Sequence, residues 1–176
     1  MGGDRFERSG DGALSRDDGG RYDAALMALD RFTTAQASPA SGYRSALAEL
    51  QAGAKRGHWI WYVFPQLEGL GRSSMSRRYA LRDGDEALAY ARDPVLGPRL
   101  VAIAIVAAQQ LAGGVSLRDL MGSDIDALKL VSSMTLFEWV AARLPDPVLA
   151  QVATQILAAA QAQGYPRCQH TLAALP

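Results

Sequence analysis

Six consecutive large apolar residues, Trp59 to Phe64, restrict the possible folds of this chain more than any other stretch. Leaving these side chains in water would cost roughly 1.5–3 kcal/mol each, so the segment must be buried. It has the propensity and the length of a β-strand. The sequence contains no second convincing strand, and an unpaired buried strand would leave backbone groups without hydrogen bonds. We therefore predict a short buried helix that ends at Phe64-Pro65.

Signals for the start and the end of helices recur along the rest of the chain. Five Asp or Ser residues occupy positions where helix N-caps are expected, and two of them precede a proline. Glycines follow most of the predicted helix ends. The predicted helices cover 23–36, 43–51, 83–91, 94–111, 123–143 and 147–163, with a short turn after Ser116 and a further helix after Ser74. These signals predict an all-α, single-domain bundle of about seven helices over 21–176. A disordered tail is predicted at 1–20, which is rich in Gly, Asp, Arg and Ser.

The composition is that of an ordinary globular domain, with 49% hydrophobic and 20% charged residues in 176. Because the formal net charge is zero, we expect no binding to nucleic acid or to an anionic membrane. Cys168 is the single cysteine, which excludes an internal disulfide and fits a reducing, cytoplasmic location. The chain has too few Cys and His residues for a clustered zinc site, and we predict no metal and no cofactor.

Polar residues flank the aromatic run on both sides. If the helix covered 58–64 and its last turn reached Gln66, then His58, Tyr62 and Gln66 would share one face, with Lys55 nearby. Such a group could bind an anionic or heavily hydroxylated ligand. His58 is the one weak candidate for a catalytic residue, because its ring can exchange a proton near neutral pH. The alternative is that His58 only caps its helix or bonds a carbonyl group.

The turn Gly69-Leu-Gly-Arg-Ser-Ser74 leads into a predicted helix. Its backbone N–H groups, together with Arg72 and Ser73, could hold a phosphate. Further arginines at 77, 78 and 82 could extend that site. The interpretation we favour for them is a solvated surface with nearby Asp83 and Asp85 as their partners. A short Gly-Ser turn is also the commonest plain connection, and this one matches neither the Walker pattern nor the dinucleotide-binding fingerprint.

Only two of the 18 basic residues are lysines, Lys55 and Lys129. We expect both to face one pocket, where part of their positive charge would stay unneutralised until an anionic ligand binds. In the second lysine's segment, Asp126, Lys129 and Ser133 share a helical face at i, i+3 and i+7. One interpretation is that the lysine and the serine form a catalytic pair of base and nucleophile. The interpretation we favour is an Asp126–Lys129 ion pair with the serine in the core.

Two stretches resemble the motifs of a known family. They are His58-Trp-Ile-Trp-Tyr-Val-Phe-Pro-Gln-Leu-Glu-Gly-Leu-Gly71 and Lys129-Leu-Val-Ser-Ser-Met-Thr-Leu-Phe137. Both are similar to motifs of the uncharacterised bacterial domain-of-unknown-function family 1810, as are Asp30-Arg-Phe32 and the segment from Tyr43 to Leu50. The resemblance spans most of 22–176 and implies a small, mainly α-helical domain without an assigned role. Some members carry the label calpastatin, but nothing in this sequence resembles a calpain-inhibitor repeat.

The leading hypothesis is recognition of a small polar or anionic ligand, such as a nucleotide or sugar phosphate, with turnover left open. Trp59 or Trp61 would form a stacking wall of a pocket beside the aromatic run. The predicted ligand-binding residues are Lys55, His58, Trp59, Trp61, Gln66, Arg72, Ser73, Lys129 and Ser133. The alternative is a non-enzymatic interaction module, in which the aromatic run is core and a helix groove binds a partner peptide. The sequence defines no oligomeric state.

Overall fold

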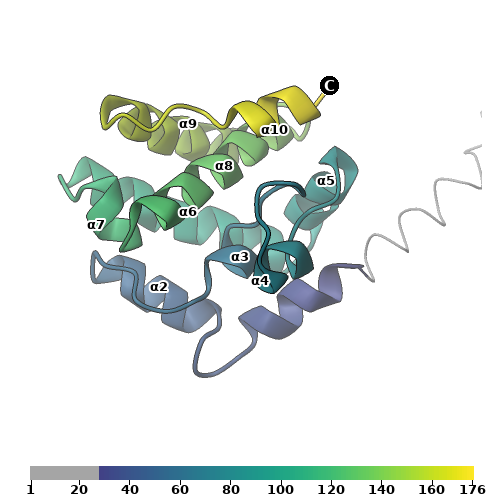
Figure 1. Cartoon of the computed structure of the whole chain (residues 1–176), viewed down its shortest axis with the longest axis horizontal. Helices are drawn as coiled ribbons and strands as arrows, with labels where there is room; N and C mark the ends of the chain where they lie inside the picture. The colour runs from purple at the N-terminus through teal and green to yellow at the C-terminus, as the bar shows by residue number, and fades with distance from the viewer. Residues whose placement is uncertain (1–27) are drawn as a thin grey trace, which may run out of the picture.

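The computed structural model describes residues 28–176, which contain helices and no strand. Four helices are short: α3 (Ile60–Val63), α4 (Ser74–Arg78), α7 (Leu117–Met121) and α10 (Gln169–Ala174). The others are a helix at 28–36, α2 (Tyr43–Gln51), α5 (Gly84–Arg92), α6 (Leu96–Ala112), α8 (Asp124–Ala141) and α9 (Pro147–Ala162). The all-α prediction is confirmed (Figure 1). The predicted tail at 1–20 and the predicted start of the first helix lie outside the described residues.

Side-chain caps fix the starts of most of the longer helices, as the sequence predicts. The Asp83 carboxylate accepts a hydrogen bond from the Glu86 N–H at 2.9 Å, and Asp146 accepts from Val148 and Leu149. The hydroxyl of Ser123 accepts from the N–H of Asp126 at 3.1 Å. Each cap satisfies backbone donors that have no partner inside the helix. The helix starts were therefore predictable to within about two residues.

α8 is the central helix of the fold (Figure 1). It packs against α9, α7, α5, α10 and α3, whereas α6 packs against α9, α2 and α5. The seven consecutive residues from Val131 to Phe137 are all buried, so this part of α8 is covered on every side. The segment from Lys129 to Phe137 therefore supplies the middle of the core.

The aromatic run forms a helix that is shorter than predicted. α3 has only four residues, and Phe64 after it leaves the helical conformation, with φ −121° and ψ 72°. Pro65 explains this end, because proline has no N–H to donate and disfavours the helical conformation in the residue before it. The predicted shared face of His58, Tyr62 and Gln66 is therefore wrong. Tyr62 is buried and its hydroxyl donates to the Ser41 carbonyl at 2.6 Å.

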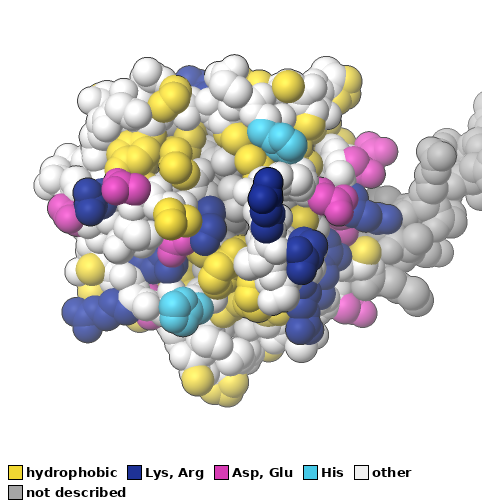
Figure 2. Space-filling model, viewed as in Figure 1, with side chains coloured by type: hydrophobic (Ala, Val, Ile, Leu, Met, Phe, Trp, Pro, Cys, Tyr) yellow, Lys and Arg dark blue, Asp and Glu magenta, His cyan; other side chains and the backbone are white. Residues whose placement is uncertain are grey.

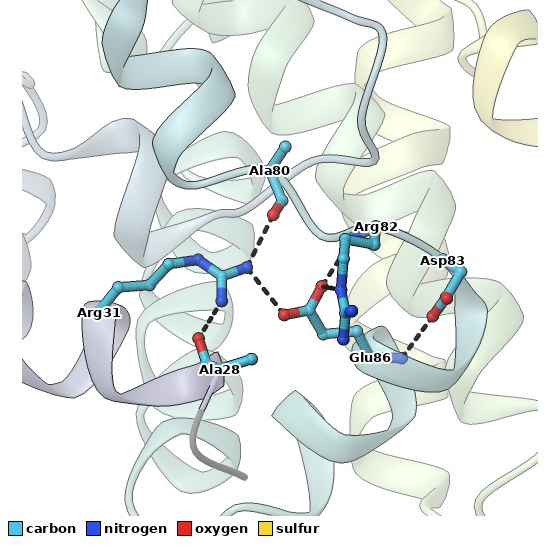
Figure 3. A network of polar contacts seen from close by, with 6 residues as sticks. All are labelled: Ala28, Arg31, Ala80, Arg82, Asp83 and Glu86. Carbon is cyan, nitrogen blue, oxygen red and sulfur yellow. Dashed lines mark hydrogen bonds and ion pairs between the residues drawn. The ribbon is translucent and has the colours of Figure 1, made fainter. Parts of the chain in front are cut away.

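A buried ion pair ties the first helix to α5 (Figure 3). Glu86 is 1% exposed, and its carboxylate lies 2.8 Å from the Arg31 guanidinium and 2.7 Å from the Arg82 N–H. Arg31 also donates to the carbonyl groups of Ala80 and Ala28. Arg31 of the Asp30-Arg-Phe32 segment therefore joins these two helices.

Within the described part of the chain, no single helix is both long and apolar enough to cross a membrane. α5 and α6 meet that requirement only when taken together, across a bend of 88°.

Candidate functional site

The two lysines of the chain meet at one carboxylate. Lys55 Nζ lies 2.5 Å from Asp126 Oδ2, and Lys129 Nζ lies 2.8 Å from Asp126 Oδ1. The Asp126–Lys129 ion pair predicted from the i, i+3 spacing is confirmed. The lysines do converge, but the group that lies between them is this aspartate rather than an open pocket.

Lys55 is held on all sides by the protein. Its side chain is 6% exposed, and besides Asp126 it donates to the Gly57 carbonyl at 2.7 Å and lies 5.2 Å from the ring centre of Trp59. Its backbone N–H donates to the Leu120 carbonyl at 2.8 Å. The ammonium group thus has two oxygen partners and an aromatic ring beside it. Lys55 therefore fastens the segment before the aromatic run onto the start of α8.

Gly122, between α7 and α8, allows this close approach. Its φ is +74°, and a Cβ there would lie 2.8 Å from the carbonyl oxygen of Lys55. We expect Gly122→Ala to destabilise the fold by more than the roughly 1–2 kcal/mol of a left-handed residue, because the methyl group also pushes the Lys55 backbone away. Gly164→Ala is the matched control, since Gly164 has φ +87° but no atom within 4 Å of its Cβ position. Equal losses in urea unfolding would contradict the close-approach argument.

Glu49 on α2 is a structural partner of the motif that sequence reasoning missed. One carboxylate oxygen accepts hydrogen bonds from the N–H groups of Arg56 and Gly57 and from the indole of Trp59, at 2.7, 2.8 and 2.7 Å. Burial raises the pKa of this carboxyl, but these hydrogen bonds and the charge of Lys55 outweigh burial, and the pKa lies below its ordinary value. No motif spacing connects Glu49 to residues seven to ten positions later, so the sequence contains no signal for it.

Other predicted site residues are divided between core and surface. Trp59 and Ser133 are fully buried, and the Ser133 hydroxyl has no hydrogen-bond partner among residues 28–176. His58 is exposed, and its ring makes no hydrogen bond to any residue of 28–176. Trp61 is half-buried, with Lys129 Nζ 4.4 Å from its ring centre. A ligand from solvent can therefore reach His58, Trp61 and Lys129 but not Trp59 or Ser133.

A small hollow lies beside Trp61. Its volume is about 20 Å³, and it is lined by Trp61, Gln66, the turn at 67–71, Ser76 and Arg77, with Tyr79 and Ala80. His170 of α10 supports the turn by donating from Nε2 to the Glu68 carbonyl at 2.9 Å, since a carbonyl can only accept. The hollow has room for one water-sized group, such as a single oxygen atom of a ligand.

Arg77 lines this hollow, and Arg72 and Arg78 are sequence neighbours of its lining residues Gly71 and Arg77. Residues 69–82 contain four arginines and no acidic residue, and Figure 2 shows Lys and Arg side chains gathered over the region of α4. Arg72, Arg77 and Arg78 are exposed, and within 28–176 none of the three forms a salt bridge. Ser73 is also exposed, and its hydroxyl accepts from the N–H of Ser76 as the cap of α4. The surface formed by Trp61, Gln66, residues 69–78 and Lys129 is hereafter called the arginine surface.

No group of three His, Cys, Asp or Glu residues in the described range is placed to hold a metal ion. The charged groups of the arginine surface are all cations, and Gln66 and the serines can also donate hydrogen bonds, a set suited to anions.

Comparisons with known proteins identify the family. The chain is similar to the crystal structure of the conserved hypothetical protein Rv1873 from Mycobacterium tuberculosis, with 41% sequence identity and a TM-score of 0.67. The match covers 84% of this chain and 95% of that protein. No curated protein matches the chain. Residues 26–168 match the family described as "Protein of unknown function (DUF1810)", which includes both motif segments. This chain therefore belongs to the DUF1810 family.

Proposed function

We propose that this protein binds a small phosphorylated ligand, such as a nucleotide or a sugar phosphate, at the arginine surface. The observation that carries the proposal is the set of three exposed arginines, Arg72, Arg77 and Arg78, without carboxylate partners in 28–176, next to a hollow between Trp61 and Gln66. Planar guanidinium groups bind phosphate oxygens through paired hydrogen bonds.

The geometry favours a ligand that binds on an open surface rather than in a deep pocket. The hollow of about 20 Å³ accepts one oxygen-sized group, so most of the ligand would lie over the turn at 69–71 and α4. Lys129 adds positive charge at the edge, because Asp126 neutralises only one of the two lysines that contact it. Four residues predicted from the sequence make no contact with the ligand in this proposal: Lys55, His58, Trp59 and Ser133. They either hold the surrounding framework or have no role in binding. No nucleophile and base are adjacent on this surface, so the proposal is recognition rather than turnover.

Charge neutralisation tests the proposal. We expect pyrophosphate and ATP to bind at low salt in isothermal titration calorimetry. The triple variant Arg72→Gln, Arg77→Gln, Arg78→Gln should weaken both by at least tenfold, which equals about 1.4 kcal/mol. Arg44→Gln, a change of the same kind at an exposed position of α2, is the matched control and should leave affinity unchanged. Absence of binding by the wild-type protein, or equal loss in both variants, would contradict the proposal.

A further inference from the structure

The turn at 69–71, which lines the hollow beside Trp61, has no hydrogen bond to hold its shape. Within 28–176, no backbone or side-chain hydrogen bond involves Gly69, Leu70 or Gly71. The chain is fixed just before the turn, where the Glu68 N–H donates to the Leu81 carbonyl at 2.9 Å. The N–H groups of 69–71 are therefore available to an anion, but the shape of the turn depends on the residues packed against it.

His170 of α10 is the residue from another helix that fixes this turn. Its Nε2 donates to the Glu68 carbonyl at 2.9 Å. Its ring also lies directly against Gly69, which has φ +94°, since a Cβ there would lie 2.9 Å from Cε1 and 3.0 Å from Nε2. The Glu68 carbonyl and the Gly69 N–H belong to one planar peptide unit. The hydrogen bond from His170 therefore sets the direction of a donor beside the hollow.

α10 is attached to α8 by polar contacts more than by apolar burial. Thr171 is the one buried residue of its six, the Thr171 hydroxyl has no partner within 28–176, and Leu172 is 46% exposed. At the two ends of the segment, Arg167 pairs with Glu138 at 2.7 Å, and the Pro176 carbonyl accepts a hydrogen bond from the end of α8. Partly exposed ion pairs stabilise little, so α10 should open more easily than the core helices.

We propose that the segment 167–176 is a strap that switches the arginine surface between a tight-binding and a weak-binding form. When α10 lies on α8, His170 holds the turn at 69–71 in the shape that presents its N–H groups. When α10 leaves α8, the Glu68 carbonyl loses its donor and the turn loses its support. This inference rests on the proposed function, because it concerns the regulation of the same surface. Coupling is reciprocal, so a bound phosphate must hold α10 on α8.

Hydrogen exchange of the full chain, with pyrophosphate as the probe, tests the coupling. No residue of α10 lines the hollow, so a direct contact does not explain protection there. We expect saturating pyrophosphate to slow amide exchange in α10 by about fivefold or more, the lower end of typical coupling between sites. Without the strap's contact the turn should bind less tightly, so His170→Ala should weaken pyrophosphate binding by a similar factor in calorimetry.

Two further variants separate positioning by His170 from a general effect of mutating α10. His170→Gln keeps a side-chain N–H donor and should restore most of the affinity. Gln169→Ala changes an exposed neighbour on the same helix, whose side chain bonds only to the Arg167 carbonyl, and should leave the affinity unchanged. Circular dichroism should show every variant folded. If His170→Ala does not fold, Glu138→Gln takes its place, because it loosens the pairing with Arg167 without touching the turn.

The outcomes distinguish the strap from the proposed function. Absence of pyrophosphate binding by the wild-type protein would contradict the proposed function and the strap together. If the wild-type protein binds but His170→Ala binds equally well, or if pyrophosphate leaves α10 exchange unchanged, the strap alone is overturned. Equal weakening by His170→Ala and Gln169→Ala would also overturn it.

Discussion

Replacing Trp59 with alanine should lower the free energy of unfolding by about 3–5 kcal/mol, the cost of removing a fully buried indole. The ring is 0% exposed and packs against Phe64, with 6.4 Å between ring centres. Its N–H is also a donor to the Glu49 carboxylate at 2.7 Å. Removing the ring therefore leaves both a cavity and a carboxylate that has lost one of its three donors. Urea unfolding followed by circular dichroism measures the loss.

Trp61→Ala is the internal control for this prediction. Trp61 lies on α3, two residues after the N-cap Trp59, but it is only half-buried, so part of its surface is already in water in the folded state. The same substitution should cost clearly less there. If the two variants were equally destabilised, the distinction between a core tryptophan and a surface tryptophan would be wrong.

Asp126→Asn should destabilise the fold by about 3–5 kcal/mol, the range for breaking a buried ion pair. The substitution keeps the size of the side chain but leaves two ammonium groups without a counter-charge. The loss of the counter-charge affects Lys55 most, because its side chain is 6% exposed and cannot reach water without moving. Lys129→Met is the matched variant, since it leaves a neutral Lys55–Asp126 pair and should cost much less. Equal stability of Asp126→Asn and the wild-type protein would show that the ion pairs do not hold the fold.

The effect of Asp126→Asn should depend on pH. Burial raises the pKa of the Asp126 carboxyl, but hydrogen bonds from Lys129 and Lys55 and their charges lower it further than burial raises it. The carboxylate therefore contributes its full stabilisation above the ordinary pKa of an aspartate, about 3.9, and loses it as the pH falls through the lowered folded-state value. The difference in unfolding free energy between wild type and Asp126→Asn should shrink over that acid range. A difference that stays constant would contradict the lowered pKa.

Local signals in the sequence predicted most of the fold. Helix starts at Ser123 and Asp146 were predictable because a capping side chain acts on N–H groups two or three residues away. α10 was not predicted, because it has six residues and Cys168 before it provides no side-chain cap. The extent of α3 was overestimated, because the apolar run indicates burial but not how many residues are helical. Capping and apolar patterns therefore predicted the long helices, whereas they missed α10 and did not fix the length of α3.

The candidate site was predictable only in part, because residues that are far apart in the sequence but in contact in the fold show no regular spacing. The Asp126–Lys129 pair lies three residues apart on one helix and was predictable. Its second partner, Lys55, is 71 positions before Asp126, and only its rarity singled it out. His170, which supports the turn at Glu68 from 102 positions away, gave no signal at all. The arginines at 72, 77 and 78 were visible as a local cluster, but their lack of carboxylate partners was not.

Titration of the ¹⁵N-labelled protein with pyrophosphate at low salt, followed by heteronuclear NMR, tests the arginine surface most directly. Backbone amides report binding residue by residue, without a substitution that could disturb the fold. The proposal predicts saturable shifts at Gly69, Gly71 and Ser76 and at the indole N–H of Trp61, all of which line the hollow or its rim. Signals of α9 should not move at constant protein concentration. Shifts confined to α6 and α9, or no shifts at any pyrophosphate concentration, would contradict it.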